Sequence, residues 1–226
     1  MKSKSTSIIT IDGTSSSGKT TISKILAKKL NFILLDSGKL YRSIGFIASE
    51  TSQSLDKINN LDKLISNISL TTNSESYEYE IYYKNKKIDH LLYDEYVGEA
   101  ASVVSKIPKV RKSMLEIQHS CASSNNLIAN GRDMGSKVFP NANLKIYINA
   151  SLDVRAKRRF DELVQRGESV KFDKVFESLK NRDKSDMNRA ISPLKIPDNA
   201  HIIDTSNLKP DAIVDKILNL YTITEN

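Results

Sequence analysis

Between residues 13 and 20 the chain reads GTSSSGKT, which fits the pattern G-x-x-x-x-G-K-[ST] at every fixed position. The motif follows the β-branched run Ser7–Asp12 and precedes apolar residues at helical spacing, as in a strand, turn and helix. Such a turn directs backbone N–H groups and the positive end of a helix at phosphate oxygens. We therefore expect a nucleoside triphosphate here, with Lys19 on its β- and γ-phosphates. Mg²⁺ is expected on the Thr20 hydroxyl, with phosphates and water completing its shell. The expected triphosphate-binding residues are Gly13, Thr14, Ser15, Ser16, Ser17, Gly18, Lys19, Thr20 and Thr21.

Strand-like and helical segments alternate along the chain and predict an α/β fold with a parallel sheet. Expected strands are residues 7–12, 32–35, 127–130, 144–149 and 202–204. Expected helices lie around residues 22–30, 40–47, 95–105, 110–123, 151–167, 175–179 and 210–221. The 226 residues suit a single domain.

The segment 52–124 is expected to be an insertion in this domain, whose core comprises residues 1–51 and 125–226. Polar residues become frequent from about residue 52, and residues 77–84 then alternate with the period of two that is typical of a strand. Asn85-Lys86-Lys87 is expected to turn the chain into a partner strand, giving a small antiparallel sheet. The tyrosines of this sheet could bind a base, but a half-buried sheet face explains them better.

Composition excludes several classes of site. The longest apolar runs, such as Ile44–Ala48, are too short to cross a bilayer, so we expect a cytoplasmic protein without a membrane partner. Cys121 is the only cysteine, which rules out an intrachain disulfide and a cysteine-based zinc site. The three histidines lack a metal-ligand spacing. The net charge of +7 permits an anionic partner, but no basic stripe with interleaved aromatics predicts nucleic acid.

Arginines recur where the predicted topology places ligands. Arg42 and Arg132 each follow a predicted strand, at the sheet edge where α/β folds bind ligands. Arg155, Arg158 and Arg159 share one helix face. Residues 182, 186 and 189 share another, which groups two arginines with an aspartate.

A phosphate loop alone does not distinguish kinases from GTPases, ATPases or regulatory nucleotide binders. The Asn-Lys-x-Asp segment that a GTPase needs is absent from the sequence. Any single arginine pair could be a surface salt bridge, worth ~0–1 kcal/mol. Several arginine groups together favour phosphoryl transfer between two anionic substrates, because such transfer requires neutralised charge on donor and acceptor.

Six segments resemble the bacterial cytidylate kinase family, in order, from about residue 8 to residue 204. They read IDGTSSSGKTT, LLDSGKLYR, ASVVSKIPKVRK, NGRDMGSKVFPNA, NASLDVRAKRR and NRDKSDMNRAISPL. The resemblance implies a three-layer P-loop fold, an inserted monophosphate-binding domain and a helical lid over about residues 151–190. It also implies a monomer that transfers phosphate from ATP to CMP or dCMP with Mg²⁺, in pyrimidine nucleotide metabolism.

The resemblance also implies roles for single residues. The implied catalytic residues are Lys19, Arg132, Arg182, Arg155, Arg158 and Arg159, the last three forming the lid over the ATP phosphates. The implied CMP-binding residues are Ser37, Arg42, Ser102, Arg111, Arg132, Asp133, Arg182, Asp186 and Arg189. Among these, Arg42, Arg132 and Arg182 would hold the phosphate. Ser102, Arg111 and Asp133 would contact cytosine, Arg189 would brace Asp133, and Asp186 would accept bonds from the sugar.

Asp133 suits cytosine because a carboxylate accepts a hydrogen bond from the N4 amino group but opposes the carbonyl of uracil. One departure from the family is Asn130, where an aspartate is often found, which leaves open how the metal is handled. Two alternatives remain open at this point. One is a kinase for UMP, AMP or another small acceptor, and the other is a non-catalytic nucleotide-binding or RNA-binding module.

Overall fold

The computed structural model describes residues 6–51 and 61–225 of the chain. The chain forms two compact units, one of Met1–Ser7 and Ala27–Ala129 and the other of Ile8–Leu26 and Asn130–Asn226. The predicted division into a core and an insertion over 52–124 stays a prediction. Its boundary at residue 52 and the outer limits at residues 1 and 226 lie outside the described residues.

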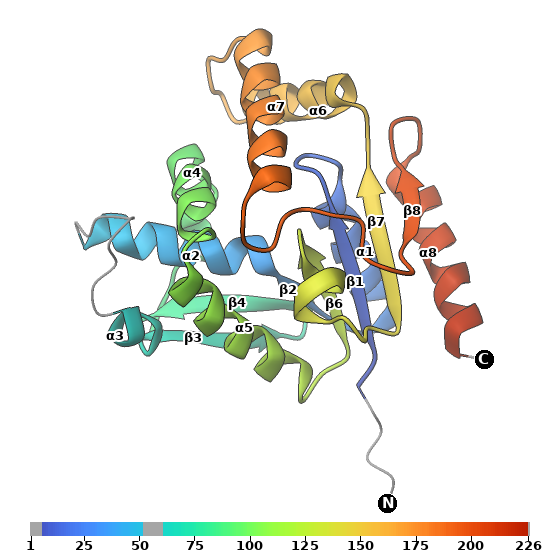
Figure 1. Ribbon diagram of the computed structural model, residues 1–226, viewed down its shortest axis with the longest axis horizontal. Helices are drawn as coiled ribbons and strands as arrows, with labels where there is room; N and C mark the ends of the chain where they lie inside the picture. The colour runs from blue at the N-terminus through green and yellow to red at the C-terminus, as the bar shows by residue number, and fades with distance from the viewer. Residues whose placement is uncertain (1–5, 52–60, 226) are drawn as a thin grey trace, which may run out of the picture. The chain divides into compact units, whose positions relative to one another are not determined.

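The unit that contains the phosphate loop is built on parallel strands (Figure 1). β1 (Ile8–Gly13) pairs with β7 (Leu144–Asn149), which pairs with β8 (His201–Asp204). β1 and β7 are apolar and largely buried, as expected for strands covered on both faces. α1 (Lys19–Leu30) begins in this unit, and α8 (Pro210–Glu225) closes the chain. The predicted parallel core is confirmed.

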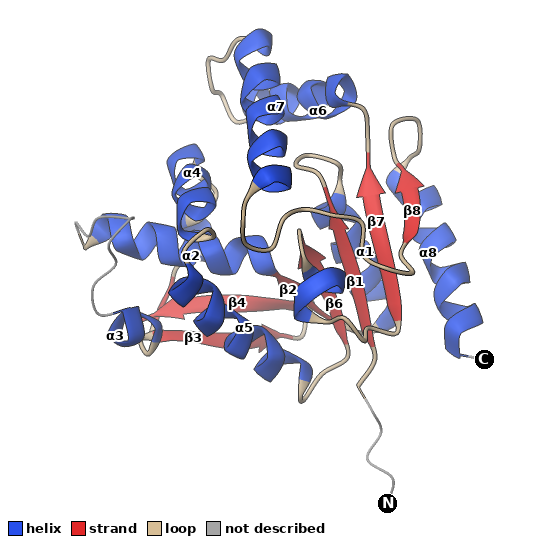
Figure 2. Cartoon of the chain, in the orientation of Figure 1, coloured by secondary structure: helices blue, strands red, loops and turns tan. Residues whose placement is uncertain are grey.

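Two helices in the same unit, α6 (Leu152–Gln165) and α7 (Phe172–Asn188), lie side by side (Figure 2). Their shared core consists of Ala156, Leu163, Val175 and Leu179. The Ser151 hydroxyl caps α6 by accepting from Val154 N at 3.4 Å, and Gly167 follows its end with φ +81°. The prediction of a helix between these two residues is confirmed, and the helix predicted around 175–179 extends over all of α7.

In the other unit the strand order is β3-β4-β2, with β6 beside β2. The bounds are β2 (Ile33–Asp36), β3 (Ile68–Asn73), β4 (Glu78–Tyr83), β5 (Lys86–Lys87) and β6 (Leu127–Gly131). β3 and β4 are antiparallel, whereas β4 pairs with β2 in parallel at Leu34 and Glu78. The antiparallel strands therefore extend the sheet that contains β2. Tyr79 and Ile81 are the buried residues of β4, which confirms the half-buried face.

The turn predicted at Asn85-Lys86-Lys87 is wrong by one residue. Lys84 and Asn85 make the turn, with φ +47° and +62°, and Lys86–Lys87 already form β5. Two central residues with positive φ are the geometry that matches the twist of a two-residue hairpin, and asparagine tolerates it. β5 pairs with only two residues of β4, so the main antiparallel partner of β4 is the preceding strand β3.

The helices of this unit are α2 (Ser37–Glu50), α3 (Leu61–Ile65), η1 (Asp89–Leu91), α4 (Glu95–Val104) and α5 (Pro108–Ala122). Asp36 caps α2 by accepting from Lys39 N at 3.3 Å, and α2 packs against α4. The Lys39 ammonium then pairs with Asp89, whose other oxygen accepts from Ile81 N at 2.8 Å. In the described part of the chain, no helix has the length and apolar character that a membrane span requires.

Candidate active site

The glycine-rich segment forms a tight turn between β1 and α1. The Thr14 hydroxyl donates to Asn149 Oδ1 at 3.1 Å, and the Ser17 hydroxyl donates to the Thr14 carbonyl at 2.9 Å. α1 begins at Lys19, so the first N–H groups of the helix face back into the turn. The turn therefore has the form of an anion-binding site at a helix N-terminus.

The Lys19 side chain is folded into this turn. Its ammonium donates to the Thr14 carbonyl and lies 3.5 Å from Ser17 Oγ, and the residue is only 6% exposed. A phosphate that enters the loop would offer this ammonium a charged acceptor in place of neutral ones, which is a stronger partner.

Thr20 lies at the exposed start of α1 and meets a buried residue of β6. Asn130 Nδ2 donates to Thr20 Oγ1 at 3.2 Å. Among the described residues, no group of three or more His, Cys, Asp or Glu side chains could hold a metal ion. An exposed hydroxyl beside a neutral amide fits a cation whose remaining ligands are phosphate and water oxygens, as Mg²⁺ prefers in nucleotide sites.

Four of the predicted acceptor residues form one ionic cluster in the unit that contains α7. Arg132 Nε lies 2.9 Å from Asp186 Oδ2, and Arg189 lies 3.9 Å from Asp186 and 4.0 Å from Asp133. Burial raises the pKa of Asp186, but the charges of Arg132, Arg182 and Arg189 outweigh burial and hold the pKa below its usual value. Arg182 and Asp186 therefore lie close together on α7, as their helical spacing predicted. Arg189 lies beside Asp186 as well, but it follows the end of α7 with an extended backbone, so helical spacing does not place it there.

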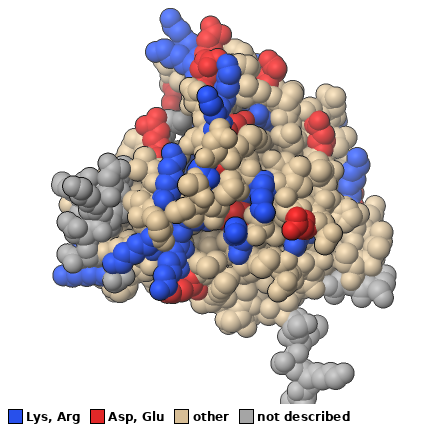
Figure 3. All heavy atoms as spheres, viewed as in Figure 1, with Lys and Arg blue, Asp and Glu red and all other residues tan. Residues whose placement is uncertain are grey.

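The three arginines of α6 have different surroundings, although helical spacing places them on one face. Arg155 is buried, and its guanidinium donates to the Ser15 carbonyl of the phosphate loop at 3.2 Å and pairs with Asp183 at 2.7 Å. Arg158 donates to the Thr205 carbonyl at 2.6 Å, and Arg159 pairs with Glu162 at 3.0 Å. Figure 3 shows basic and acidic side chains intermixed over the α6–α7 pair. Their role over the ATP phosphates stays a prediction.

The remaining acceptor residues lie in the other unit. Ser37 is buried at the start of α2 and accepts from Gln118 Nε2 at 2.9 Å. The Arg42 guanidinium donates to the Leu92 and Asp94 carbonyls, at 2.7 Å and 3.2 Å.

Arg111 is held at the end of α4, the helix that carries Ser102. Arg111 donates to the Ser105 carbonyl at 3.3 Å and lies over the Tyr41 ring at 5.5 Å. The Ser105 hydroxyl donates to the Ser102 carbonyl at 3.0 Å. These contacts fix the arginine beside the end of the helix that carries Ser102.

Two buried polar residues at the site were missed in the sequence. Gln118 shares the buried face of α5 with Val110, Met114 and Cys121, so a lone amide in an apolar stripe was its signal. Asp12 is the second-to-last residue of the apolar strand β1 and is 0% exposed. The signal for Asp12 was a carboxyl group within an apolar run that predicts a buried strand, because a buried carboxyl group needs specific hydrogen-bond partners.

Burial raises the pKa of Asp12 from 3.8 to about 6, although the Gly135 and Met134 N–H groups lower it in part. The folded chain therefore retains a proton where the unfolded chain has lost it. The resulting stabilisation is fully present below pH 3.8 and is lost as pH rises through about 6. We expect a loss of about 3 kcal/mol in the free energy of unfolding from this group.

Urea unfolding of the wild type and Asp12→Asn, between about pH 4 and pH 8, measures this contribution. The difference between the two proteins isolates Asp12, because the other carboxyl groups are present in both. A difference that stays constant over this pH range would contradict the prediction.

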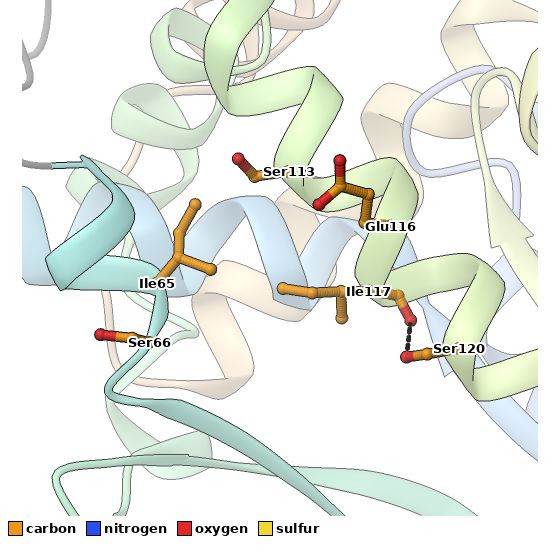
Figure 4. Close-up of a pocket in the computed structure, with 6 residues that line it drawn as sticks. All are labelled: Ile65, Ser66, Ser113, Glu116, Ile117 and Ser120. Atoms are coloured by element: carbon orange, nitrogen blue, oxygen red, sulfur yellow. Dashed lines mark hydrogen bonds between the residues drawn. The ribbon is translucent and has the colours of Figure 1, made fainter.

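A surface hollow lies between α3 and α5 in the unit that contains both (Figure 4). Its lining residues are Ile65, Ser66, Ser113, Glu116, Ile117 and Ser120. It contains none of the predicted site residues and no basic side chain, so it does not suit a nucleotide phosphate.

Comparison with known proteins gives a consistent result. The profile of the family described as cytidylate kinase matches residues 9–223. A cytidylate kinase from Pasteurella multocida is 39% identical over 94% of this chain and 93% of that protein. One from Vibrio cholerae is 38% identical over 96% of both chains. An uncharacterized protein from Eubacterium ventriosum superposes with a TM-score of 0.53 at 13% identity, covering 96% of this chain and 98% of that one, which shows the fold alone.

Proposed function

The chain belongs to the cytidylate kinase family, and on that basis we propose which of its residues transfer the γ-phosphoryl group of ATP to CMP or dCMP. The products are ADP and CDP or dCDP. The observation that carries this function is the phosphate loop at residues 13–20, within a chain that matches the family over residues 9–223. We further propose that the protein works as a cytoplasmic monomer in pyrimidine nucleotide metabolism.

The donor side of the reaction is assigned to the phosphate loop. Its N–H groups and the start of α1 hold the β- and γ-phosphates of ATP, and the Lys19 ammonium moves from the Thr14 carbonyl onto a phosphate oxygen. Arg155 is placed to respond to ATP binding, because its guanidinium already contacts the loop at the Ser15 carbonyl.

Mg²⁺ is proposed as the metal, held by the Thr20 hydroxyl together with phosphate and water oxygens. When bound, it neutralises charge on the β- and γ-phosphates. Asn130 orients the Thr20 hydroxyl through its 3.2 Å hydrogen bond and adds no charge of its own.

The acceptor side is assigned to the ionic cluster around Asp186 and to Arg42. Arg132, Arg182 and Arg42 hold the phosphate of CMP, with Ser37 beside it. Arginine suits this task because its charge is permanent and its planar fork binds two oxygens at once. Asp186 accepts hydrogen bonds from the sugar hydroxyls in place of the one it now receives from Arg132.

No covalent enzyme intermediate is needed. An oxygen of the acceptor phosphate attacks the γ-phosphorus in line, the bond from that phosphorus to the bridging oxygen of ADP breaks, and ADP leaves. The chain contributes position and positive charge, through Lys19, Arg132 and Arg182. Arg155, Arg158 and Arg159 are proposed to exclude water, which suppresses hydrolysis of ATP.

Base choice is assigned to Asp133, with Ser102 and Arg111 as further contacts to cytosine. We expect Asp133→Asn to lower the CMP-over-UMP ratio of kcat/KM at least roughly tenfold, because an amide can donate to the uracil carbonyl. Steady-state kinetics with both acceptors measure the ratio. Asp153→Asn, which removes an exposed carboxylate from the start of α6, is the matched control and should leave the ratio unchanged. An unchanged ratio in Asp133→Asn would remove this residue from base recognition.

A panel of nucleoside monophosphates with Mg-ATP, read out as ADP formation, tests the function. CMP and dCMP should be the preferred acceptors. Preference for UMP or AMP would indicate another monophosphate kinase. Salt-sensitive RNA binding without acceptor-dependent ATP turnover would favour a non-catalytic module.

A further inference from the structure

Asp12 is a fully buried carboxylate that the phosphoryl transfer does not use. It lies on β1, directly before the phosphate loop, and is paired in register with Tyr147 of β7. Burying a carboxylate is costly unless hydrogen bonds compensate for the lost water. The pKa of Asp12, raised to about 6, reports that burial outweighs the compensation.

Both oxygens of this carboxylate hold the turn that follows β6. Oδ1 accepts from Met134 N at 2.8 Å, and Oδ2 accepts from Gly135 N at 2.7 Å. These N–H groups open η2 (Met134–Val138), a short π-helical turn that begins immediately after Asp133. The same turn follows Arg132, so Asp12 fixes the backbone beside two proposed acceptor residues.

The residue that would ordinarily cap such a turn is Asp133 itself. An aspartate at this position usually accepts from the N–H groups at the start of its own helix. Here the Asp133 side chain makes no capping hydrogen bond, and its carboxylate instead lies 4.0 Å from Arg189. Asp12, on the neighbouring strand, therefore caps the start of η2 in place of Asp133.

We propose that Asp12 is a positioning residue for base selection, which caps η2 so that the Asp133 carboxylate can face the acceptor base. The proposal rests on the proposed function, since it assumes that Asp133 reads the base. The proposal predicts that replacing Asp12 weakens binding of the acceptor more than binding of ATP, although Asp12 is adjacent in sequence to the phosphate loop.

The variant Asp12→Asn tests this with little change in shape. An amide offers one acceptor and one donor, so it leaves one of the two N–H groups facing another donor. We expect the dissociation constant for CMP to rise roughly 10- to 100-fold and the CMP-over-UMP ratio of kcat/KM to fall by a similar factor. Binding of ATP, measured by calorimetry in the absence of acceptor, should change by less than about threefold.

Thr10→Val is the matched control, because Thr10 lies two residues earlier on the same face of β1. Its hydroxyl also lies beside this turn, 2.7 Å from where a side chain on Gly135 would begin, and it has no hydrogen-bond partner in the described structure. Replacing it should leave CMP binding, ATP binding and the CMP-over-UMP ratio within about twofold of wild type.

Gly135→Ala is the second variant, and it keeps the Asp12 carboxylate. Its Cβ would lie 2.7 Å from Thr10 Oγ1 and 3.1 Å from Pro197 Cγ, so the packing of the turn against these two side chains must change. The same loss of base selection is expected, which keeps the proposal testable if Asp12→Asn does not fold.

The outcomes separate the proposal from its premise. If the wild type does not prefer CMP, the proposed function fails. If the wild type prefers CMP and a folded Asp12→Asn or Gly135→Ala retains that preference, the positioning role is overturned. A loss of ATP binding as large as the loss of CMP binding would also overturn it, because Asp12 would then act on the phosphate loop.

Discussion

Arg182→Ala is expected to lower kcat for CMP phosphorylation by roughly 10³- to 10⁵-fold, the range found when a transition-state arginine is removed from a phosphoryl-transfer site. Arg182 lies on α7 and is close enough to Asp186 to help lower the pKa of that carboxyl. Its charge is thus available where the acceptor phosphate is proposed to lie. The KM for ATP should change much less, because the phosphate loop binds ATP without this residue.

Steady-state kinetics with ATP and CMP varied independently separate the two effects. Lys184→Ala removes an exposed positive charge two residues further along α7 and is the matched control. Its kcat should remain close to that of the wild type. A wild-type kcat in Arg182→Ala would exclude Arg182 from the catalytic residues.

Local features of this chain could be predicted from its sequence. The phosphate loop is contiguous, and the apolar run before it and the helical spacing after it identify β1 and α1. Helical periodicity likewise predicted one helix face for residues 182, 186 and 189. Arg182 and Asp186 do lie on α7, whereas Arg189 follows the end of this helix with an extended backbone and lies 3.9 Å from Asp186. Such features depend on backbone geometry over a few residues, which periodicity reports directly.

Partners that are distant in sequence could not be predicted in this way. Asp12 and Gly135 are 123 residues apart, and Arg132 and Asp186 are 54 apart. No periodicity links them, because the fold sets their proximity. A shared helix face also does not identify the partner of each side chain. The arginines at positions 155, 158 and 159 share one face, but they contact three different residues, namely Ser15, Thr205 and Glu162 in that order.

The strand β3 shows a different limit. Its residues, ISLTTN, have a polar composition that gives no strand pattern of its own. β3 forms because β4 offers an antiparallel edge, and only partly buried positions of β3 face the interior. Strand formation here depends on the neighbouring strand more than on the intrinsic preference of the residues.

Gly13→Ala is expected to have the largest effect on stability, with a loss of at least ~3 kcal/mol in the free energy of unfolding. A Cβ at this position would lie 1.9 Å from the Ile148 carbonyl oxygen of β7, and φ is +149°, which L side chains rarely adopt. β1 and β7 are paired at these two residues, so neither backbone can move without breaking the sheet at the phosphate loop. ATP affinity should therefore fall together with stability.

Gly167→Ala is the control that separates backbone conformation from crowding. Gly167 has φ +81°, but a Cβ there would meet no atom within 4 Å. It should cost only about 1–2 kcal/mol, the penalty of a left-handed conformation, and leave ATP binding intact. Urea unfolding and calorimetric titration with ATP measure both variants. Equal losses in the two proteins would mean that the contact with Ile148 is not what requires glycine at the start of the loop.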